Sequence, residues 1–218
     1  MSIWTSFVEI MQAGLVFLSQ VYGGNMGLAI ITFSMLVRLA MLPLTMKLAL
    51  RSLTRNNILK QLQPELARLR ERLRKQPERL ARETMEFFKN HGLKPIDLSG
   101  ILGGLIQIPV FLCLYSAIRK TLRGGRFLWI KDISKPDFFL TMLVTVLTYI
   151  TVAVNPGLAE HNRLFIILLP AVMTMFFLLY LPAGIGLYWG SINTVNILQN
   201  VILLRKTGKV SGNTIHIS

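Results

Sequence analysis

Residues 27–46, GLAIITFSMLVRLAMLPLTM, form an apolar run of 20 residues that contains a single charge, Arg38. An α-helix of about 20 residues is long enough to cross the hydrocarbon core of a bilayer. An arginine at that depth costs about 3 kcal/mol or more, so it persists only where it faces water or a partner. Ser34 lies four residues earlier on the same helix face, and Pro43 should kink the helix or loosen its hydrogen bonds. The run therefore predicts a membrane-spanning helix with a narrow polar face that carries a cation.

The charge of Arg38 has two interpretations. A structural arginine would pair with a carboxylate on a neighbouring helix. The four other apolar runs of spanning length contain no Asp or Glu, so no such partner is available inside the membrane. The sequence therefore favours an arginine that faces a hydrated cavity.

The composition of the chain is that of a polytopic membrane protein. Of its 218 residues, 52% are hydrophobic, and five apolar runs of spanning length account for this excess. The formal net charge of +14 indicates contact with anionic lipid or RNA. A single cysteine, Cys113, excludes a disulfide within the chain, and the sequence contains no cluster of metal ligands. We expect an all-α polytopic membrane protein with no metal and no cofactor.

The alternation of apolar and charged segments predicts a topology. We expect five transmembrane helices over residues 25–50, 99–118, 138–154, 164–181 and 183–204. A charged cytoplasmic segment, an external loop, a short cytoplasmic loop and a basic cytoplasmic tail occupy residues 51–98, 119–137, 155–163 and 205–218. This topology places 17 Lys and Arg on the cytoplasmic side and six outside. Because positive loops stay in the cytoplasm, the bias favours an external N-terminus and a cytoplasmic C-terminus.

The N-terminal residues 1–24 also have two interpretations. Their apolar residues recur at spacings of three and four, with Ser6, Glu9 and Gln20 on the other side: Ile3, Phe7, Ile10, Gly14, Phe17 and Val21. This pattern favours an amphipathic helix that lies in the membrane interface. The alternative is an additional transmembrane helix, since Glu9 is the only charge in the segment.

The cytoplasmic segment 51–98 has a charged helical pattern. Between Lys47 and Lys94 the chain has 13 Lys or Arg against five Glu. Its leucines repeat at spacings of three and four: Leu59, Leu62, Leu66, Leu69 and Leu73. Pro77 favours the start of a second helix. We expect a helical hairpin over residues 52–75 and 78–90, either solvated without a partner or bound to an acidic surface such as lipid or RNA.

Two later apolar runs carry polar residues. Gln107 lies beside Pro109 in the run 99–118, where the proline distorts the backbone. The run 183–204 aligns four polar side chains on one helix face: Trp189, Asn193, Asn196 and Asn200. Such a stripe either hydrogen-bonds neighbouring helices or lines the cavity that holds Arg38.

Several separated motifs occur in a distinctive order between residues 20 and 206. They are Val37-Arg38 with Pro43-Leu44-Thr45, Gln61 with Pro64, Gln107-Ile-Pro109-Val-Phe111, Leu128-Trp129-Ile-Lys-Asp132, and residues 176–189 ending in Tyr188-Trp189, followed by Asn193 and Gln199. In this order and spacing the motifs resemble those of the YidC family of membrane protein insertases.

The resemblance implies a five-helix core around a hydrophilic groove that opens to the cytoplasm and sideways to lipid. Arg38 and Ser34 match groove positions of the family, and Gln107 and the Tyr188–Trp189 pair match groove-lining or substrate-contacting positions. With the polar stripe included, the candidate groove residues are Arg38, Ser34, Gln107, Tyr188, Trp189, Asn193 and Asn196.

The resemblance also implies a location and partners. The location is the bacterial inner membrane, and the substrates are nascent membrane proteins. The charged hairpin and the basic tail match regions linked to ribosomes, targeting receptors or substrate capture, and the Sec translocon and anionic lipids are further candidate partners. Because many relatives add a signal-anchor span and a large periplasmic domain, we expect either a minimal form of the family or a shortened chain.

The resulting hypothesis is an insertase that releases apolar segments into lipid without ATP, since no glycine motif here fits a phosphate-binding loop. A small transporter or channel with Arg38 as its anion site is the alternative, although no inverted repeat supports it. A third class is a chaperone that holds membrane subunits without inserting them. We expect no enzyme, because His91, His161 and His216 have no nucleophile or metal set nearby.

Overall fold

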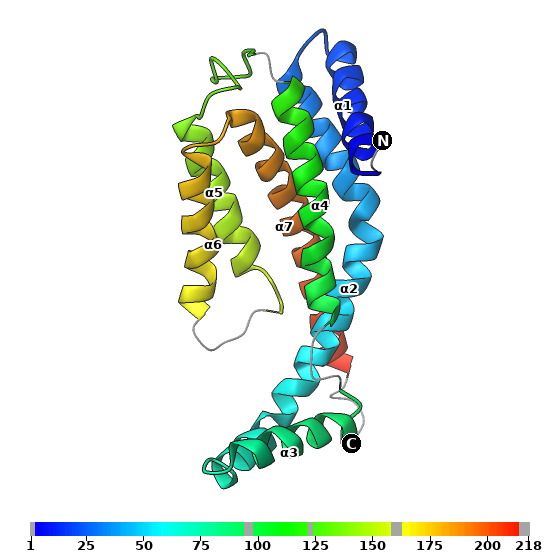
Figure 1. Cartoon of the computed structure of the whole chain (residues 1–218), viewed down its shortest axis with the longest axis vertical. Coiled ribbons are helices and arrows are strands. Elements are labelled where there is room, and N and C mark those ends of the chain that lie inside the picture. Colours follow the sequence, from blue (N-terminus) through cyan, green and yellow to red (C-terminus); the bar gives the residue numbers. More distant parts are fainter. Residues whose placement is uncertain (1–2, 94–97, 122–123, 158–162, 214–218) are drawn as a thin grey trace. The chain divides into compact units, whose positions relative to one another are not determined.

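The computed structural model describes residues 3–93, 98–121, 124–157 and 163–213, with the backbone alone for residues 3–4, 98–107, 163 and 206–213 (Figure 1). The helices are α1 (Ile3–Val21), α2 (Met26–Arg72), α3 (Pro77–Asn90), α4 (Leu98–Thr121), α5 (Phe138–Ala153), α6 (Arg163–Leu178) and α7 (Ala183–Asn213). Within these ranges the only β-type pairing is an isolated bridge between Phe127 and Ile130. The described chain is therefore all-α, which confirms the predicted fold class.

The chain divides into two compact units. The larger unit comprises residues 1–43 and 107–218, and the smaller unit comprises residues 44–106. Helix α2 contributes to both units, and it continues without a break through residues 50 and 51, where the sequence separates the first span from the charged hairpin. Helix α7 likewise continues to Asn213, beyond the expected end of the last span at residue 204.

The apolar core of the larger unit draws side chains from most of its helices and from the loop between α4 and α5. Its buried members include Val8, Met11 and Leu15 of α1, Ile30 of α2, Cys113, Leu114, Ala117 and Ile118 of α4, Phe127, Ile130 and Ile133 of the loop, Leu140 and Val144 of α5, and Ile185, Leu187 and Tyr188 of α7. Burial of this shared apolar surface holds segments that are far apart in the sequence against one another.

Helix α1 is apolar on two faces. Val8, Met11 and Leu15 are buried in the core, whereas the stripe that the sequence assigns to the membrane side, including Ile10 and Phe17, is exposed. A Cβ atom on Gly14 would lie 2.5 Å from the ring of Phe33 in α2, so these two helices approach closely. The placement of α1 in the membrane interface stays a prediction.

Helix α2 satisfies the length and composition of a membrane-spanning helix, with a mean hydropathy of 1.9 over its most apolar 18 residues. Helices α5 and α6 are apolar but shorter. Helix α5 packs against both α6 and α7. Large apolar side chains such as Leu164, Phe165 and Phe176 are exposed on α6, as expected for a surface that faces lipid. The number of spans stays a prediction.

The loop between α4 and α5 forms the cap of α7. The backbone N–H groups of Ala183 and Gly184, at the start of α7, donate to the carbonyl oxygens of Lys135 and Ile133 at 2.8 and 2.9 Å. The Asp137 side chain accepts from the backbone N–H of Leu140 at 2.7 Å and caps the start of α5. The loop therefore satisfies helix-terminal donors that would otherwise lack partners.

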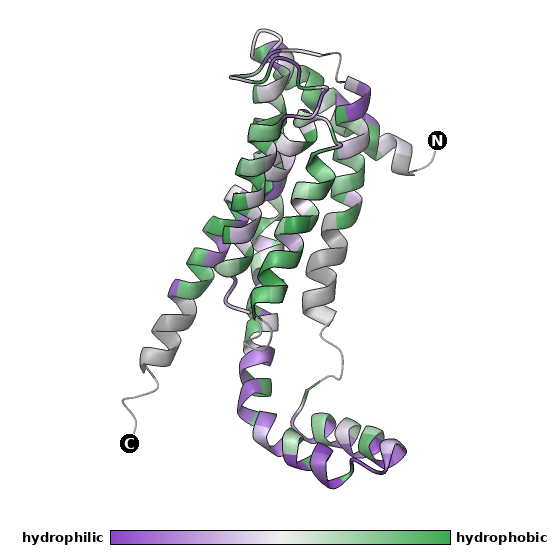
Figure 2. Ribbon diagram, turned by 90° about the vertical axis from the view of Figure 1, so that its left-hand side faces the viewer, coloured by the Kyte–Doolittle hydropathy of each residue, from purple (hydrophilic) through white to green (hydrophobic). Residues whose placement is uncertain are grey.

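The smaller unit contains the charged part of α2 and helix α3. Arg72 of α2 and Glu83 of α3 form an ion pair at 2.8 Å across the turn that joins the two helices. Leu66 and Leu73 of the leucine repeat are buried. Figure 2 shows that hydrophilic residues predominate in this part of α2 and on α3, whereas hydrophobic residues predominate in the helices of the larger unit.

Gly27 provides a test of the contact between α2 and the α4–α5 loop. A Cβ atom on Gly27 would lie 2.3 Å from the ring of Phe127, a buried residue. We expect Gly27→Ala to lower the free energy of unfolding by about 1–3 kcal/mol through overpacking, although alanine ordinarily stabilises a helix by about 1 kcal/mol over glycine. Thermal unfolding of the purified protein in detergent measures the change. In a Phe127→Ala background the loss should shrink, and a higher melting temperature for Gly27→Ala would contradict the contact.

Asp132 provides a test of the loop itself. Hydrogen bonds from the Ser134 hydroxyl and backbone N–H, followed by the charge of Lys135, lower the pKa of the Asp132 carboxyl. Because this pKa is lower in the folded state, the carboxylate stabilises the fold above its ordinary pKa of about 3.9, and this contribution disappears as the pH falls further. The difference in melting temperature between the wild type and Asp132→Asn should therefore be constant from about pH 7 to 5 and shrink below about pH 4. Lys131→Gln, in the same loop, should show no such acid-dependent difference, and an unchanged Asp132→Asn difference at low pH would contradict the role of the carboxylate.

Candidate functional site

Arg38 connects α2 to α7 inside the larger unit. Only 9% of its surface is exposed. Its Nη2 atom donates to Oδ1 of Asn196 at 2.5 Å and to Oε1 of Gln199 at 3.2 Å. Its Nε atom is buried and has no hydrogen-bond partner among the described residues. The guanidinium is therefore held through Nη2, by two uncharged amides.

The spacing of the two amides explains why they meet at one atom. Asn196 and Gln199 are three residues apart, so they lie on neighbouring positions of one face of α7. Ser34 lies one turn before Arg38 on α2 and is buried, and its hydroxyl donates to the carbonyl oxygen of Ile30 at 2.5 Å. Ser34 is thus on the same helix face as Arg38, and its hydroxyl group donates its hydrogen bond within its own helix.

An aromatic cluster joins α4 to α7 in the same unit. The ring of Phe111 lies 5.8 Å from the rings of both Tyr188 and Trp189, measured between centroids. Tyr115, one turn further along α4, stacks on Phe111 at 6.1 Å. Tyr188 is buried, and Trp189 is half-buried. These contacts fix the two α7 aromatics that the family motif identifies, because aromatic pairs of this separation are attractive.

The polar stripe of α7 contacts two different neighbours. Asn193 donates through Nδ2 to the Thr148 hydroxyl of α5 at 2.9 Å and accepts from the Thr151 hydroxyl at 3.2 Å. Asn200 donates to the carbonyl oxygen of Thr151 at 2.9 Å. Asn196 alone of the three asparagines bonds to Arg38. Asn193 and Asn200 therefore hydrogen-bond a neighbouring helix, which is one of the two interpretations of the stripe. A groove role for Asn193 stays a prediction.

Two glutamines differ from the predicted set of groove residues in what the structure shows of them. The backbone of Gln107 lies in α4, but its side chain is outside the described part of the structure, so its place in the groove stays a prediction. Gln199 is not among the candidate groove residues, although it bonds directly to Arg38 and is buried. Its position three residues after Asn196, as an amide within an apolar helix, is the pattern that could have identified it.

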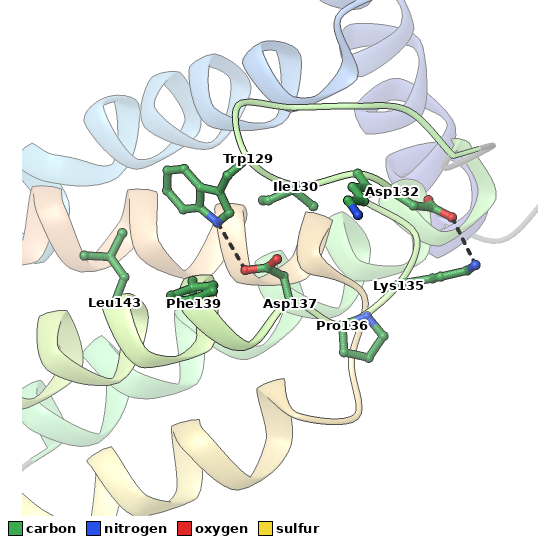
Figure 3. A pocket seen from close by; sticks show the side chains of 9 residues that line it. Trp129, Ile130, Asp132, Lys135, Pro136, Asp137, Phe139 and Leu143 are labelled. Atoms are coloured by element: carbon green, nitrogen blue, oxygen red, sulfur yellow. Dashed lines mark hydrogen bonds and ion pairs between the residues drawn. The ribbon is translucent and has the colours of Figure 1, made fainter.

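A separate pocket of about 850 Å³ lies between the α4–α5 loop and α5 (Figure 3). Its lining residues are Trp129, Ile130, Lys131, Asp132, Lys135, Pro136, Asp137, Phe139 and Leu143. Figure 3 shows the Trp129 indole directed at the Asp137 carboxylate, where Nε1 donates to Oδ1 at 3.2 Å. None of the candidate groove residues lines this pocket. Among the described side chains, no group of three His, Cys, Asp or Glu is placed to hold a metal ion.

Comparisons with known proteins support the resemblance of the motifs. The "Membrane protein insertase YidC" of Vibrio cholerae serotype O1 is 32% identical over 212 residues, which cover 94% of this chain and 38% of the relative. The "Membrane protein insertase YidC 1" of Halalkalibacterium halodurans is 33% identical over 209 residues, which cover 92% of this chain and 79% of the relative. The chain thus spans well under half of the first relative and most of the second.

A solved structure described as an active YidC insertase with its first transmembrane domain resolved has a similar fold. Its TM-score is 0.62 at 24% identity, over 91% of this chain and 46% of that chain. Residues 17–210 match the family described as 60Kd inner membrane protein. The predicted relationship to the YidC insertases is confirmed, and the chain belongs to the 60Kd inner membrane protein family.

Proposed function

We propose that the chain is an inner-membrane insertase that receives nascent membrane proteins in a groove at Arg38 and releases their apolar segments into lipid without ATP. The observation that carries this proposal is the buried guanidinium, which hydrogen-bonds to two neutral amides within an apolar helical unit. The names of the relatives support the same function, and we assign the chain no enzymatic activity.

The physical task of such a groove is to move the polar flank of a substrate part of the way through the membrane. Water and polar side chains replace hydrocarbon along that path, so the flank loses less solvation. Arg38 attracts an acidic or polar flank and releases it when the adjacent apolar segment enters lipid. About 20 residues such as Leu, Ile, Val and Phe supply roughly 6–12 kcal/mol on insertion scales, which drives the transfer without nucleotide hydrolysis.

The remaining candidate residues form the walls of the groove in this proposal. Ser34 lies beside Arg38 on α2, and Asn196 faces it from α7. Tyr188 and Trp189 lie earlier on α7, against Phe111 of α4. Gln107 and Asn193 complete the proposed set.

The topology and partners belong to the same proposal. The N-terminus lies outside and the C-terminus in the cytoplasm, so the charged segment of α2 and α3 is cytoplasmic. Its cations, such as Arg79 and Arg82, suit anionic lipid, and ribosomes, a targeting receptor and the Sec translocon are candidate partners.

A small transporter is the second candidate, because Nε of Arg38 is a buried donor that an inorganic anion could accept from. Flux of chloride or phosphate through proteoliposomes distinguishes the two functions. An insertase should show no flux above that of empty liposomes, and flux that depends on Arg38 would favour the transporter.

Replacement of Arg38 tests the insertase proposal. In proteoliposomes that contain Arg38→Ala, insertion of a single-span substrate with an acidic N-terminal flank should fall about 10-fold, which is about 1.4 kcal/mol of lost attraction. Arg38→Lys should retain part of the activity, because lysine keeps the charge but cannot bond to both amides in the same plane. Protease protection of the flank measures insertion.

A substrate with a neutral flank is the matched control, and its insertion should change much less. Full insertion of the acidic flank by Arg38→Ala would contradict the role of the charge.

The single cysteine allows a direct test of the topology. In a Cys113→Ala background, Glu71→Cys places a thiol in the charged hairpin and Ser134→Cys places one in the α4–α5 loop. A membrane-impermeant maleimide added to intact cells, after the outer membrane is opened where one is present, should label position 134 but not position 71. Inside-out vesicles should give the opposite pattern, and labelling of both positions from one side would contradict the topology.

A further inference from the structure

The hydrogen bonds of Arg38 are asymmetric. Both amide oxygens of α7 accept from the same nitrogen, Nη2, and Nε has no hydrogen-bond partner among the described residues. The two acceptors must be the carbonyl oxygens, because the guanidinium can only donate. The pair therefore restrains the orientation of the guanidinium through Nη2 alone.

The chemical type of the two partners matters as much as their position. Asp and Glu would offer an oxygen in the same place as Asn and Gln, but they would add a negative charge about 3 Å from the guanidinium. Such an ion pair would cancel most of the positive field at this point. Elsewhere the chain does pair cations with acids, as in Arg72 with Glu83 and Lys135 with Asp132.

We infer that Asn196 and Gln199 are specificity-determining positioning residues: they orient the Arg38 guanidinium without neutralising it, so that its charge selects substrates with an acidic flank. The inference rests on the proposed insertase function. It adds that the selectivity for flank charge depends on the neutrality of two α7 side chains, as well as on the arginine.

Isosteric charge changes test this inference. Asn196→Asp keeps the oxygen that Arg38 contacts and cancels its charge, so insertion of an acidic-flank substrate should fall about as far as in Arg38→Ala. The ratio of insertion between acidic and neutral flanks, measured in the same proteoliposomes, should fall about 10-fold. Asn196→Ala removes the contact but leaves the charge, so the same ratio should fall only about 2-fold to 3-fold.

Asn200→Asp is the matched control. It adds the same charge to the same helix one turn away, where the amide bonds to the Thr151 carbonyl of α5 instead of Arg38. The ratio between acidic and neutral flanks should stay near the wild-type value in this variant, even if total insertion falls. A ratio that falls equally in Asn196→Asp and Asn200→Asp would overturn the inference, because it would reflect any added charge on α7.

Gln199→Glu repeats the test at the second amide if Asn196→Asp does not fold. For the wild type, a series of substrates whose flanks carry net charges from −2 to +2 should insert with decreasing efficiency as the charge becomes positive. A flat series would overturn the inference without any variant.

The proposed role of the Arg38 charge and the inferred role of the two amides can fail separately. If Arg38→Ala inserts the acidic flank fully, the proposed role of the charge in insertion fails. If Arg38→Ala lowers insertion but Asn196→Asp and Gln199→Glu leave the ratio unchanged, the inference about the two amides fails and the proposed function stands.

Discussion

The hydrogen bonds between the Arg38 guanidinium and two amides join α2 to α7 around a buried charge. A buried charge must be hydrogen-bonded or hydrated, since an uncompensated one costs several kcal/mol. Asn196 and Gln199 supply hydrogen bonds to Arg38 only if α7 presents that one face to α2. The rotation of α7 about its own axis is thus set by a polar requirement, and the apolar contacts of the helix must be compatible with it.

Several other described contacts of α7 are consistent with this rotation. Its first N–H groups donate to carbonyl oxygens of the α4–α5 loop, which fixes where the helix starts. Gly186 allows close approach to α5, since a Cβ atom there would lie 2.8 Å from Leu140. Asn193 then bonds to threonines of α5, while Tyr188 packs on Phe111 of α4. Because these contacts lie on different sides of one helix, a change at any of them can move the amides relative to Arg38.

The sequence predicts the elements of this arrangement better than their pairing. The all-α class, the isolated Arg38 and the polar stripe of α7 all follow from apolar periodicity and charge. Periodicity gives the direction of a side chain but not the identity of its neighbour. Asn193 and Asn196 differ by about 60° around the helix axis, and that difference directs one to α5 and the other to Arg38. Sequence reasoning names Gln199 only as part of a family motif, because the expected partner of a buried arginine is an acid, whereas the structure pairs Arg38 with amides.

Neutral partners leave the charge of Arg38 uncompensated inside the larger unit. A carboxylate at either amide position would pair with the guanidinium and reduce the penalty of burying it. The chain instead supplies two neutral amides, which bond to the guanidinium without compensating its charge. Sites that sacrifice local stability in this way are characteristic of functional positions, where a strained or unsatisfied group is kept for what it binds. In the proposed groove, this uncompensated charge is the feature that attracts the acidic flank of a substrate.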